Sequence, residues 1–360
     1  MSTPGQAAAP DDVAAEVVIE ALGVSVAIPT DAGDVARLRR QWSRALTHRP
    51  ADVTIEPTHR SDDEVARDYG ITTQVTMAAL RETAGRRLNI HAGAVSDDAG
   101  RALTVIGASG AGKTTAINHL AQRLGYLSDE TVSLDDDLVI HPHPKPLSVI
   151  ADRDFPHVKV SLSPDELGLL EPAGPSRLHR IVLLRRGDDG PARLVALEAP
   201  LAIVEIVAQT SSLVLLEHPM DRLARTLAAC GGAWVLHYSE IEDWIDPLVG
   251  LLDSAPQPAH AHVHHPSVAP PSATSAHTWQ RSAWNDAVQY DDQLVLLVGD
   301  TAHLLAGLGV VAWLALASPQ TTDALVAHAQ QELGEHPDAP TLVRAALDEL
   351  AERGIVHAPA

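Results

Sequence analysis

Apolar and polar positions follow two different periods along the first 84 residues, which predicts a small lobe of strands and helices. Residues 16–28 are rich in Val, Ile and Ala on both sides of a Leu-Gly turn, a pattern typical of two short strands. Residues 34–46 carry apolar side chains at helical spacing, and residues 53–55 favour a third strand. We therefore expect residues 1–14 to form a disordered tail and residues 15–84 to form an N-terminal α+β lobe.

Residues 85–253 carry the pattern of a mixed sheet with helices around it. A short β-branched and apolar run, residues 102–106, suits a buried parallel strand, and residues 114–124 place apolar side chains at helical spacing. Before the strand at 102–106, the pattern predicts a helix over residues 71–87 and a strand over residues 88–95. The same reasoning predicts strands at 126–132, 180–184 and 234–238 and helices at 201–209, 221–229 and 241–252.

Prolines, alanines and histidines fill residues 254–282, which predicts an irregular linker. A Pro/Ala segment lacks the outer partners of a defined metal site. We therefore interpret its central histidines as residues that bind Zn²⁺ or Ni²⁺ only adventitiously: His260, His262, His264 and His265.

Residues 283–360 show an ordered pattern again. Residues 287–290 and 294–298 flank an Asp-Asp pair and predict a hairpin, and the apolar run at 304–316 predicts a helix. Two more helices are bounded by residues typical of helix ends: Thr321 or Thr322, Gly334, Pro340 and Gly354. A hairpin with three helices predicts a winged-helix-like domain. The fold class expected for the whole chain is α/β.

Composition narrows the choice of partners. The 360 residues are 45% hydrophobic and 20% charged, as in a globular protein, and the net charge of −21 argues against nucleic acid or an anionic membrane as a partner. The single cysteine excludes a disulfide framework. The sequence shows neither a secretory signal nor an apolar run long enough to span a bilayer. We expect a cytoplasmic protein; whether it is a homo-oligomer is left open.

The strongest motif is Gly-Ala-Ser-Gly-Ala-Gly-Lys-Thr-Thr at residues 107–115, a full match to the phosphate-binding pattern G-x-x-x-x-G-K-[ST]. Its backbone N–H groups are expected to face the phosphates of ATP. Lys113 is expected to contact the β- and γ-phosphates, and the Thr114 hydroxyl is expected to bind Mg²⁺. Only three of the 26 basic residues are lysines, so a lysine here suggests a need for a compact charge. The predicted nucleotide contacts are Gly107, Ser109, Gly110, Ala111, Gly112, Lys113, Thr114 and Thr115.

Two acids follow the next predicted strand. Asp129 and Glu130 come where a strand after a phosphate loop commonly holds a second Mg²⁺ contact, so one is predicted to bind the metal and the other to accept a proton. Asp129 is the favoured metal ligand; which of the two is the base is left open. His91, in the strand before the loop, is on its own typical of a hydrogen-bonded structural residue.

The core resembles the bacterial HPr kinase/phosphorylase family. The similarity lies in the run His91 to Val95, the loop at 107–115, Ser-Asp-Glu at 128–130 and Pro-Lys-Pro-Leu-Ser at 144–148. The resemblance implies a catalytic role for His91 close to the phosphates, and for Asp129 and Glu130 as the acid pair. The chain lacks the Glu-x-Arg-Gly-Leu-Gly-type signature and a clear copy of the late basic loop of true HPr kinases, so we expect another acceptor.

The C-terminal region resembles the PqqD-like domains that recognise ribosomally made peptides. The similarity lies in the following residues: Asp291-Asp292, Leu294 to Val298, Gly309 to Trp313, Thr321-Thr322 and Leu347 to Ile355. From Trp284 onward there are eleven acidic residues and two arginines, a balance of 2 − 11 = −9, which disfavours DNA. We expect a precursor peptide to add as a strand along the exposed hairpin edge.

The two resemblances together predict a kinase with a peptide-holding domain. The predicted function is ATP-dependent phosphorylation of a Ser or Thr hydroxyl of a precursor peptide, with the leader held by residues 283–360. The alternative is a nucleotide-binding accessory protein that presents a leader peptide to other enzymes without phosphoryl transfer. A third hypothesis is a serine kinase that acts on a folded carrier protein.

Overall fold

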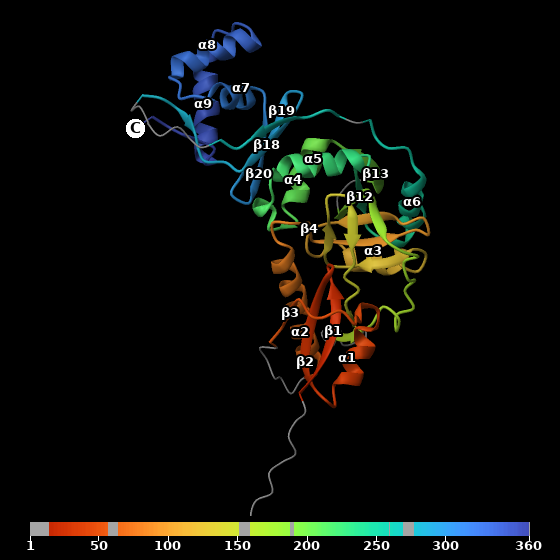
Figure 1. Cartoon of the computed structure of the whole chain (residues 1–360). Helices are drawn as coiled ribbons and strands as arrows, with labels where there is room; N and C mark the ends of the chain where they lie inside the picture. Colours follow the sequence, from red (N-terminus) through yellow and green to blue (C-terminus); the bar gives the residue numbers. More distant parts are fainter. Residues whose placement is uncertain are drawn as a thin grey trace, which may run out of the picture. The chain divides into compact units, whose positions relative to one another are not determined.

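The computed structural model describes residues 14–56, 64–150, 159–187, 191–258, 260–268 and 277–359. The fold is mixed α/β, which confirms the predicted class (Figure 1). Apart from Ala14, the tail predicted at residues 1–14 lies outside the described residues. The chain forms two compact units: the first has residues 1–84, 92–102 and 113–177, and the second has residues 85–91, 103–112 and 178–360. The domain boundaries given above stay predictions.

The first unit begins with a small mixed sheet. β1 (Ala14–Ala21) pairs antiparallel with β2 (Val24–Asp31), and β2 pairs parallel with β3 (Val53–Thr54), as the alternation of residues predicted. The turn between β1 and β2 consists of Leu22 and Gly23, both at positive φ. Two helices pack against this sheet and enclose an apolar core (Figure 1).

The helices of this lobe differ in length from the prediction. The helix expected at residues 34–46 is α1 (Val35–Gln41), followed by a short 3₁₀ turn at Ser43–Ala45. The chain leaves the α conformation at Trp42, whose side chain is almost fully buried in the core. The helix expected at 71–87 is α2 (Glu64–Thr83), which begins one to two turns earlier and ends before Gly85, a residue at φ +72°.

The rest of the first unit consists of short strand pairs and one helix. β5 (Ala92–Ser96) pairs antiparallel with β7 (Gly125–Ser128), and α3 (Lys113–Leu120) packs against β5. Two further antiparallel pairs are β8 with β9 and β10 with β11: Val132–Leu134, Val139–His141, Leu147–Ile150 and Lys159–Leu162. Two strands, β6 (Arg101–Ile106) and β12 (Ser176–Arg186), each have residues in both units.

The second unit contains a mixed strand group with two helices. β12 pairs parallel with β15 (Ala233–Tyr238), and β15 pairs antiparallel with β13 (Arg193–Leu197). α4 (Ala199–Val207) and α5 (Pro219–Ala229) lie close to their predicted positions. The smaller elements are β4 (Leu88–Ile90), β14 (Thr210–Ser211) and the 3₁₀ turn η2 (Leu213–Leu215).

One helix of the second unit was predicted as continuous and is not. Instead of one helix at 241–252, the chain forms η3 (Glu242–Trp244), α6 (Ile245–Gly250) and η4 (Leu251–Asp253). Pro247 lies in the first turn of α6, where a missing N–H is tolerated, whereas it would interrupt a helix that began at 241. The proline therefore explains where α6 begins.

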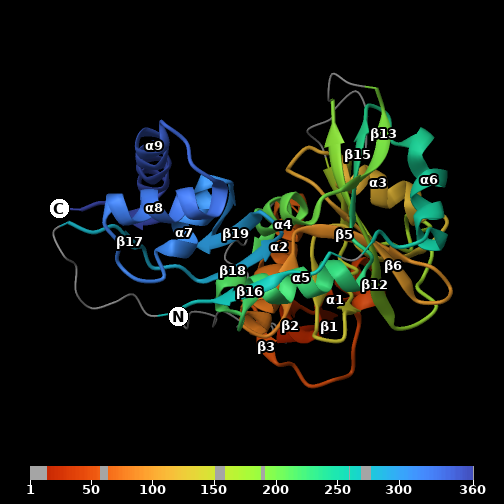
Figure 2. The same ribbon diagram turned by 90° about the horizontal axis from the view of Figure 1, so that it is seen from above.

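The C-terminal part of the second unit is a four-stranded antiparallel sheet with three helices. The strand order is β16 (Val263–Pro266), β18 (Asp286–Tyr290), β19 (Gln293–Val298) and β20 (Thr301–Ala306). Figure 2 shows β16, β18 and β19 next to one another. The helices are α7 (Leu308–Ala315), α8 (Thr322–Leu333) and α9 (Ala339–Glu352), and β17 (Gln280–Arg281) pairs with β21 (Val356–His357).

Two predictions for this region are wrong. The run at 304–316 was predicted as one helix, but residues up to Ala306 form β20, because they pair with β19 across the turn at Gly299. The helix starts only after Gly307. The irregular linker predicted at 254–282 contains β16, whose pairing with β18 supplies order that its own sequence does not indicate. The hairpin edge that we expected to be exposed is thus covered by a strand of the same chain.

Candidate functional site

The glycine loop (residues 107–112) lies between β6 and α3, so the predicted order of strand, loop and helix is confirmed. Gly110 and Gly112 have φ of +82° and +89°, a region in which other residues are strained. A Cβ at Gly112 would also collide with the Tyr238 hydroxyl, which donates a hydrogen bond to the Ala111 carbonyl. The conformation of the loop therefore depends on its glycines.

The remaining residues of the motif differ in exposure. Gly107 is buried, while Ser109 and the two threonines of the first turn of α3, Thr114 and Thr115, are exposed. Lys113 is the first residue of α3 and is 7% exposed. Burial lowers the pKa of Lys113 from its ordinary value.

β7 ends directly before the two acids that the sequence predicted. All four of its residues are buried. The Ser128 hydroxyl then accepts hydrogen bonds from the backbone N–H groups of Glu130 (3.2 Å) and Thr131 (3.1 Å). Such a serine turn fixes the backbone that follows the strand. The positions of Asp129 and Glu130 are thus determined by their own local sequence.

Asp129 lies at the centre of a polar cluster. The Thr114 hydroxyl donates to its Oδ2 at 3.5 Å, and the Tyr126 hydroxyl donates to its Oδ1 at 3.0 Å. Burial and, after it, the charge of Asp129 raise the pKa of Tyr126 well above its ordinary value, so the phenol remains a donor. A hydroxyl and a carboxylate that face each other are oxygen ligands of the kind Mg²⁺ prefers, so Thr114 and Asp129 fit this ion.

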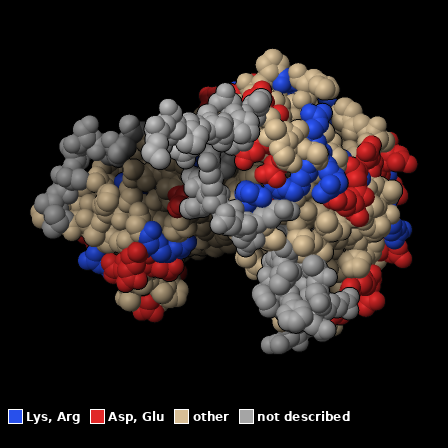
Figure 3. Space-filling view, turned by 90° about the horizontal axis from the view of Figure 1, so that it is seen from below, with Lys and Arg blue, Asp and Glu red and all other residues tan. Residues whose placement is uncertain are grey.

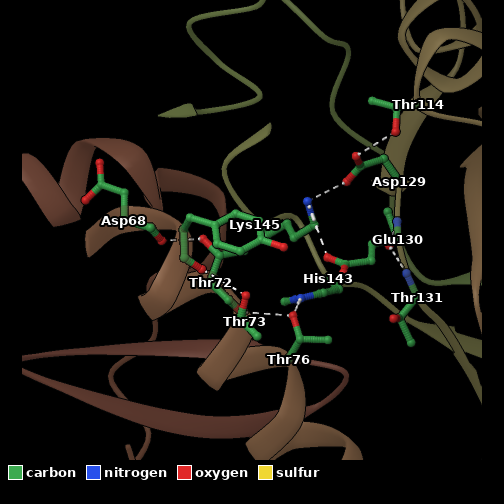
Figure 4. Close-up of polar contacts among 12 residues, drawn as sticks. Asp68, Thr72, Thr73, Thr76, Thr114, Asp129, Glu130, Thr131, His143 and Lys145 are labelled. Atoms are coloured by element: carbon green, nitrogen blue, oxygen red, sulfur yellow. Dashed lines mark hydrogen bonds and ion pairs between the residues drawn. The ribbon is translucent and has the colours of Figure 1, made fainter. Parts of the chain in front are cut away.

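Lys145 joins the two acids and was missed as a site residue. Its Nζ lies 3.2 Å from Oδ1 of Asp129 and 3.4 Å from Oε2 of Glu130, and the side chain points between the two carboxylates (Figure 4). Lys145 is 7% exposed. Burial alone lowers the pKa of a lysine, but the charges of Asp129 and Glu130 outweigh it and raise the pKa of Lys145. The cluster therefore contains a charged lysine at neutral pH.

The sequence did contain a signal for Lys145. Lysine is rare in this chain, and rarity was the argument that singled out Lys113. The same argument applies to Lys145, which stands between Pro144 and Pro146, so its backbone is restricted on both sides. The resemblance described above includes Lys145 only as one residue of the run 144–148.

His143, two residues before Lys145, makes a polar contact with α2. Its Nε2 lies 2.9 Å from the Thr76 hydroxyl of α2 (Figure 4). The histidine is 0% exposed. Burial first, and then the positive charge of Lys145, lower the pKa of His143 to about 3. The imidazole is therefore neutral and connects α2 to the segment that carries Lys145.

His91 lies in a bend that divides the predicted strand 88–95 into β4 and β5. The residue is exposed, and its backbone N–H donates to the Gln209 carbonyl at 2.6 Å. The next residue, Ala92, donates its N–H to the carbonyl of Glu130 at 3.0 Å. Of the predicted catalytic and metal residues, the structure brings together Thr114, Asp129 and Glu130; a catalytic role for His91 stays a prediction.

Comparison with known proteins adds no assignment, since neither a protein-family model nor a curated protein matches the chain. Every helix within the described residues is too short or too polar to cross a membrane. On the face drawn in Figure 3, Lys and Arg side chains lie next to Asp and Glu side chains. Within the described residues, the cluster around Asp129 is therefore the feature that points most directly to a function.

Proposed function

We propose that the chain is an ATP-dependent kinase that phosphorylates a Ser or Thr hydroxyl of a ribosomally made precursor peptide. The observation that supports it best is the contact between the first turn of α3 and the acids after β7: Thr114 of the G-x-x-x-x-G-K-[ST] motif lies 3.5 Å from Asp129. Motif residues and acids distant in sequence are expected to meet in this way when they share a metal-bound nucleotide.

In this proposal, the residues of the site bind the nucleotide, hold the metal ion or accept the proton. The backbone of the glycine loop and Lys113 bind the phosphates of ATP, while Thr114 and Asp129 hold Mg²⁺. Bound Mg²⁺ supplies positive charge that neutralises the phosphate oxygens. Glu130 accepts the proton of the peptide hydroxyl. The hydroxyl oxygen forms a bond to the γ-phosphorus of ATP, and the bond between that phosphorus and ADP breaks. Glu130 suits the base because its side chain is 39% exposed, against 5% for Asp129.

The leader peptide is assigned to the C-terminal sheet. Both edges of the hairpin β18–β19 are paired, with β16 on one side and β20 on the other. An added strand therefore joins β16 or β20, the two edge strands of this sheet. The balance of −9 from Trp284 onward favours a leader with basic residues over a nucleic acid.

A second candidate is an accessory protein that binds ATP and presents the leader without transfer. It is favoured by one observation: Lys145 contacts both acids, so each carboxylate already has a cationic partner. In this reading the lysine takes the position that a metal ion has in a kinase, and Asp129 and Glu130 only stabilise the fold.

The two candidates are separated by a transfer assay. The chain is incubated with γ-labelled ATP, Mg²⁺ and the short peptides encoded in neighbouring reading frames. A kinase labels one peptide on Ser or Thr, and the label disappears in Lys113→Ala and Asp129→Asn. Glu130→Gln lowers kcat by about 100-fold or more while ATP binding stays.

Matched controls test whether charge removal alone is responsible. Asp98→Asn and Glu171→Gln remove exposed carboxylates of the same unit and are expected to label the peptide like the wild type. ATP binding without any label on a bound peptide contradicts the kinase and supports the accessory protein.

A further inference from the structure

We propose that His218, His264 and Asp286 form a binding site for Zn²⁺. The three side chains come from three separate segments: the residue before α5, β16 and the first residue of β18. Their ligand atoms all lie within 4.8 Å of one another. Two imidazoles and one carboxylate are a common protein ligand set for zinc, with water in the fourth position. This site does not depend on the proposed kinase function.

Asp286 is held in place by the start of α5. It is 0% exposed, and its Oδ2 accepts hydrogen bonds from the backbone N–H groups of Met220 (2.8 Å) and Asp221 (3.4 Å). Its Oδ1 lies 2.7 Å from Nε2 of His264. One carboxylate oxygen is therefore fixed by the backbone, and the other faces the histidines. Backbone contacts of this kind orient a ligating carboxylate.

The pairing of β16 with β18 brings His264 to this carboxylate. His264 lies opposite Val288 and Pro266 lies opposite Asp286, so His264 and Asp286 are diagonal neighbours on one face of the sheet. His262, directly before β16, contacts Asp221 Oδ1 of α5 at 2.9 Å, which fixes the start of the strand against the same helix. Figure 2 shows β16 beside β18, with α5 nearby.

His218 completes the set from an unusual backbone conformation. Its φ of 48° and ψ of 57° are left-handed, a region that residues other than glycine rarely adopt. Its ring lies 4.9 Å from the ring of His264, centre to centre and nearly perpendicular. The side chain is 50% exposed, which gives a metal ion access from solvent. A half-exposed histidine beside a second histidine and a buried carboxylate gives three ligand atoms that one ion can share.

The chemistry of the donors selects the metal. Imidazole nitrogen favours zinc and its first-row neighbours over Mg²⁺ and Ca²⁺, which prefer oxygen ligands. The ion would connect β16 to β18 and to α5, so its expected role is to fix residues 262–266 in the sheet. The histidine tract thus has, in the folded chain, the outer partners that its sequence alone does not provide.

The test uses the full chain, prepared without a polyhistidine tag and treated with a chelator. Zn²⁺ is titrated in competition with a zinc indicator, and Co²⁺ is added to follow its visible absorption. We expect one ion per chain, a tetrahedral Co²⁺ spectrum, and an affinity lowered at least ~10-fold by His218→Gln and by His264→Gln. His260→Gln, which removes an exposed histidine of the same tract, is the matched control and is expected to bind like the wild type.

His218→Gln keeps the test valid if variants of the buried Asp286 do not fold, because His218 is half exposed. Zn²⁺ is also expected to raise the melting temperature of the wild type and not that of His218→Gln. The proposal is overturned if no ion binds. It is also overturned if binding survives both substitutions or if His260→Gln weakens it equally, since the ion would then bind the histidine tract without needing His218 and His264.

Discussion

His143 allows a quantitative prediction about stability and pH. The imidazole is fully buried, and its pKa is lowered to about 3 in the folded chain. In the unfolded chain the pKa of histidine is about 6.5. The folded state therefore binds fewer protons than the unfolded state below about pH 6.5, and the free energy of unfolding must fall as the pH falls through this window.

The magnitude follows from the two pKa values. Between about pH 8 and about pH 5, His143 alone should lower the free energy of unfolding by about 2 kcal/mol, and by about 5 kcal/mol in total once the pH passes below its folded pKa. His143→Gln removes the titrating group while its amide can still reach the Thr76 hydroxyl, the partner of Nε2. The variant should therefore lose about 2 kcal/mol less than the wild type between these pH values.

Amide hydrogen exchange in α2 is the appropriate assay, because α2 carries Thr76, the partner of His143, and both residues belong to the first unit. Exchange in the peptide that covers residues 64–83 is measured at several pH values and corrected for the chemical exchange rate. His48→Gln, which removes an exposed histidine of the same unit, should follow the wild type. Equal losses of protection in wild type and His143→Gln would refute the reasoning, since protonation of His143 in the unfolded chain would then not be the cause of the pH dependence.

Three further outcomes are expected. Lys145→Met should lower the free energy of unfolding by about 3 kcal/mol in urea titrations, because the buried carboxylate of Asp129 loses its cation; an unchanged midpoint contradicts the buried ion pair. Gly112→Ala should destabilise by more than about 1 kcal/mol at φ +89°, and Tyr238→Phe in the same chain should restore only part of this, because the collision is relieved but the strain remains; full restoration argues against the strain. Cys230, whose pKa is raised by burial to about 12, should resist iodoacetamide at neutral pH until the chain is unfolded, and rapid labelling of the folded chain contradicts this.

Elements defined by local signals could be predicted from the sequence. The hairpins on either side of Leu22-Gly23 and of Asp291-Asp292 were found because alternation and turn residues coincide there. β20 and β16 were not found for opposite reasons. The last three residues of β20 lie in a continuous apolar run, and such a run does not distinguish a strand from a helix. β16 has no apolar pattern, and only its pairing with β18 makes it a strand.

The candidate site divides in the same way. The glycine loop and the acids after β7 are local features, each fixed by a few consecutive residues, and both were predicted. Lys145 and His143 belong to the site through contacts with Asp129 and Thr76, which are 16 and 67 residues away in the chain. Thr114 and Asp129 are also 15 residues apart, but there a motif pairs a phosphate loop with a following acid. No such pattern pairs Lys145 or His143 with its partner, so their contacts follow from the fold alone.

Lysine is rare in this sequence, and the contacts of Lys113 and Lys145 in the fold show where it is used. Of 26 basic residues 23 are arginines, and two of the three lysines, Lys113 and Lys145, lie at the candidate site. The Lys145 ammonium is surrounded by single oxygens of two different residues, Asp129 and Glu130, rather than by one carboxylate that a planar guanidinium could bind with two parallel hydrogen bonds. Lys113 is equally buried and stands at the lysine position of the G-x-x-x-x-G-K-[ST] motif. Both lysines are almost fully buried, and Asp129 links them, since it contacts Lys145 directly and Thr114, the residue after Lys113 in α3. This shared neighbour is the physical reason to treat them as parts of one site.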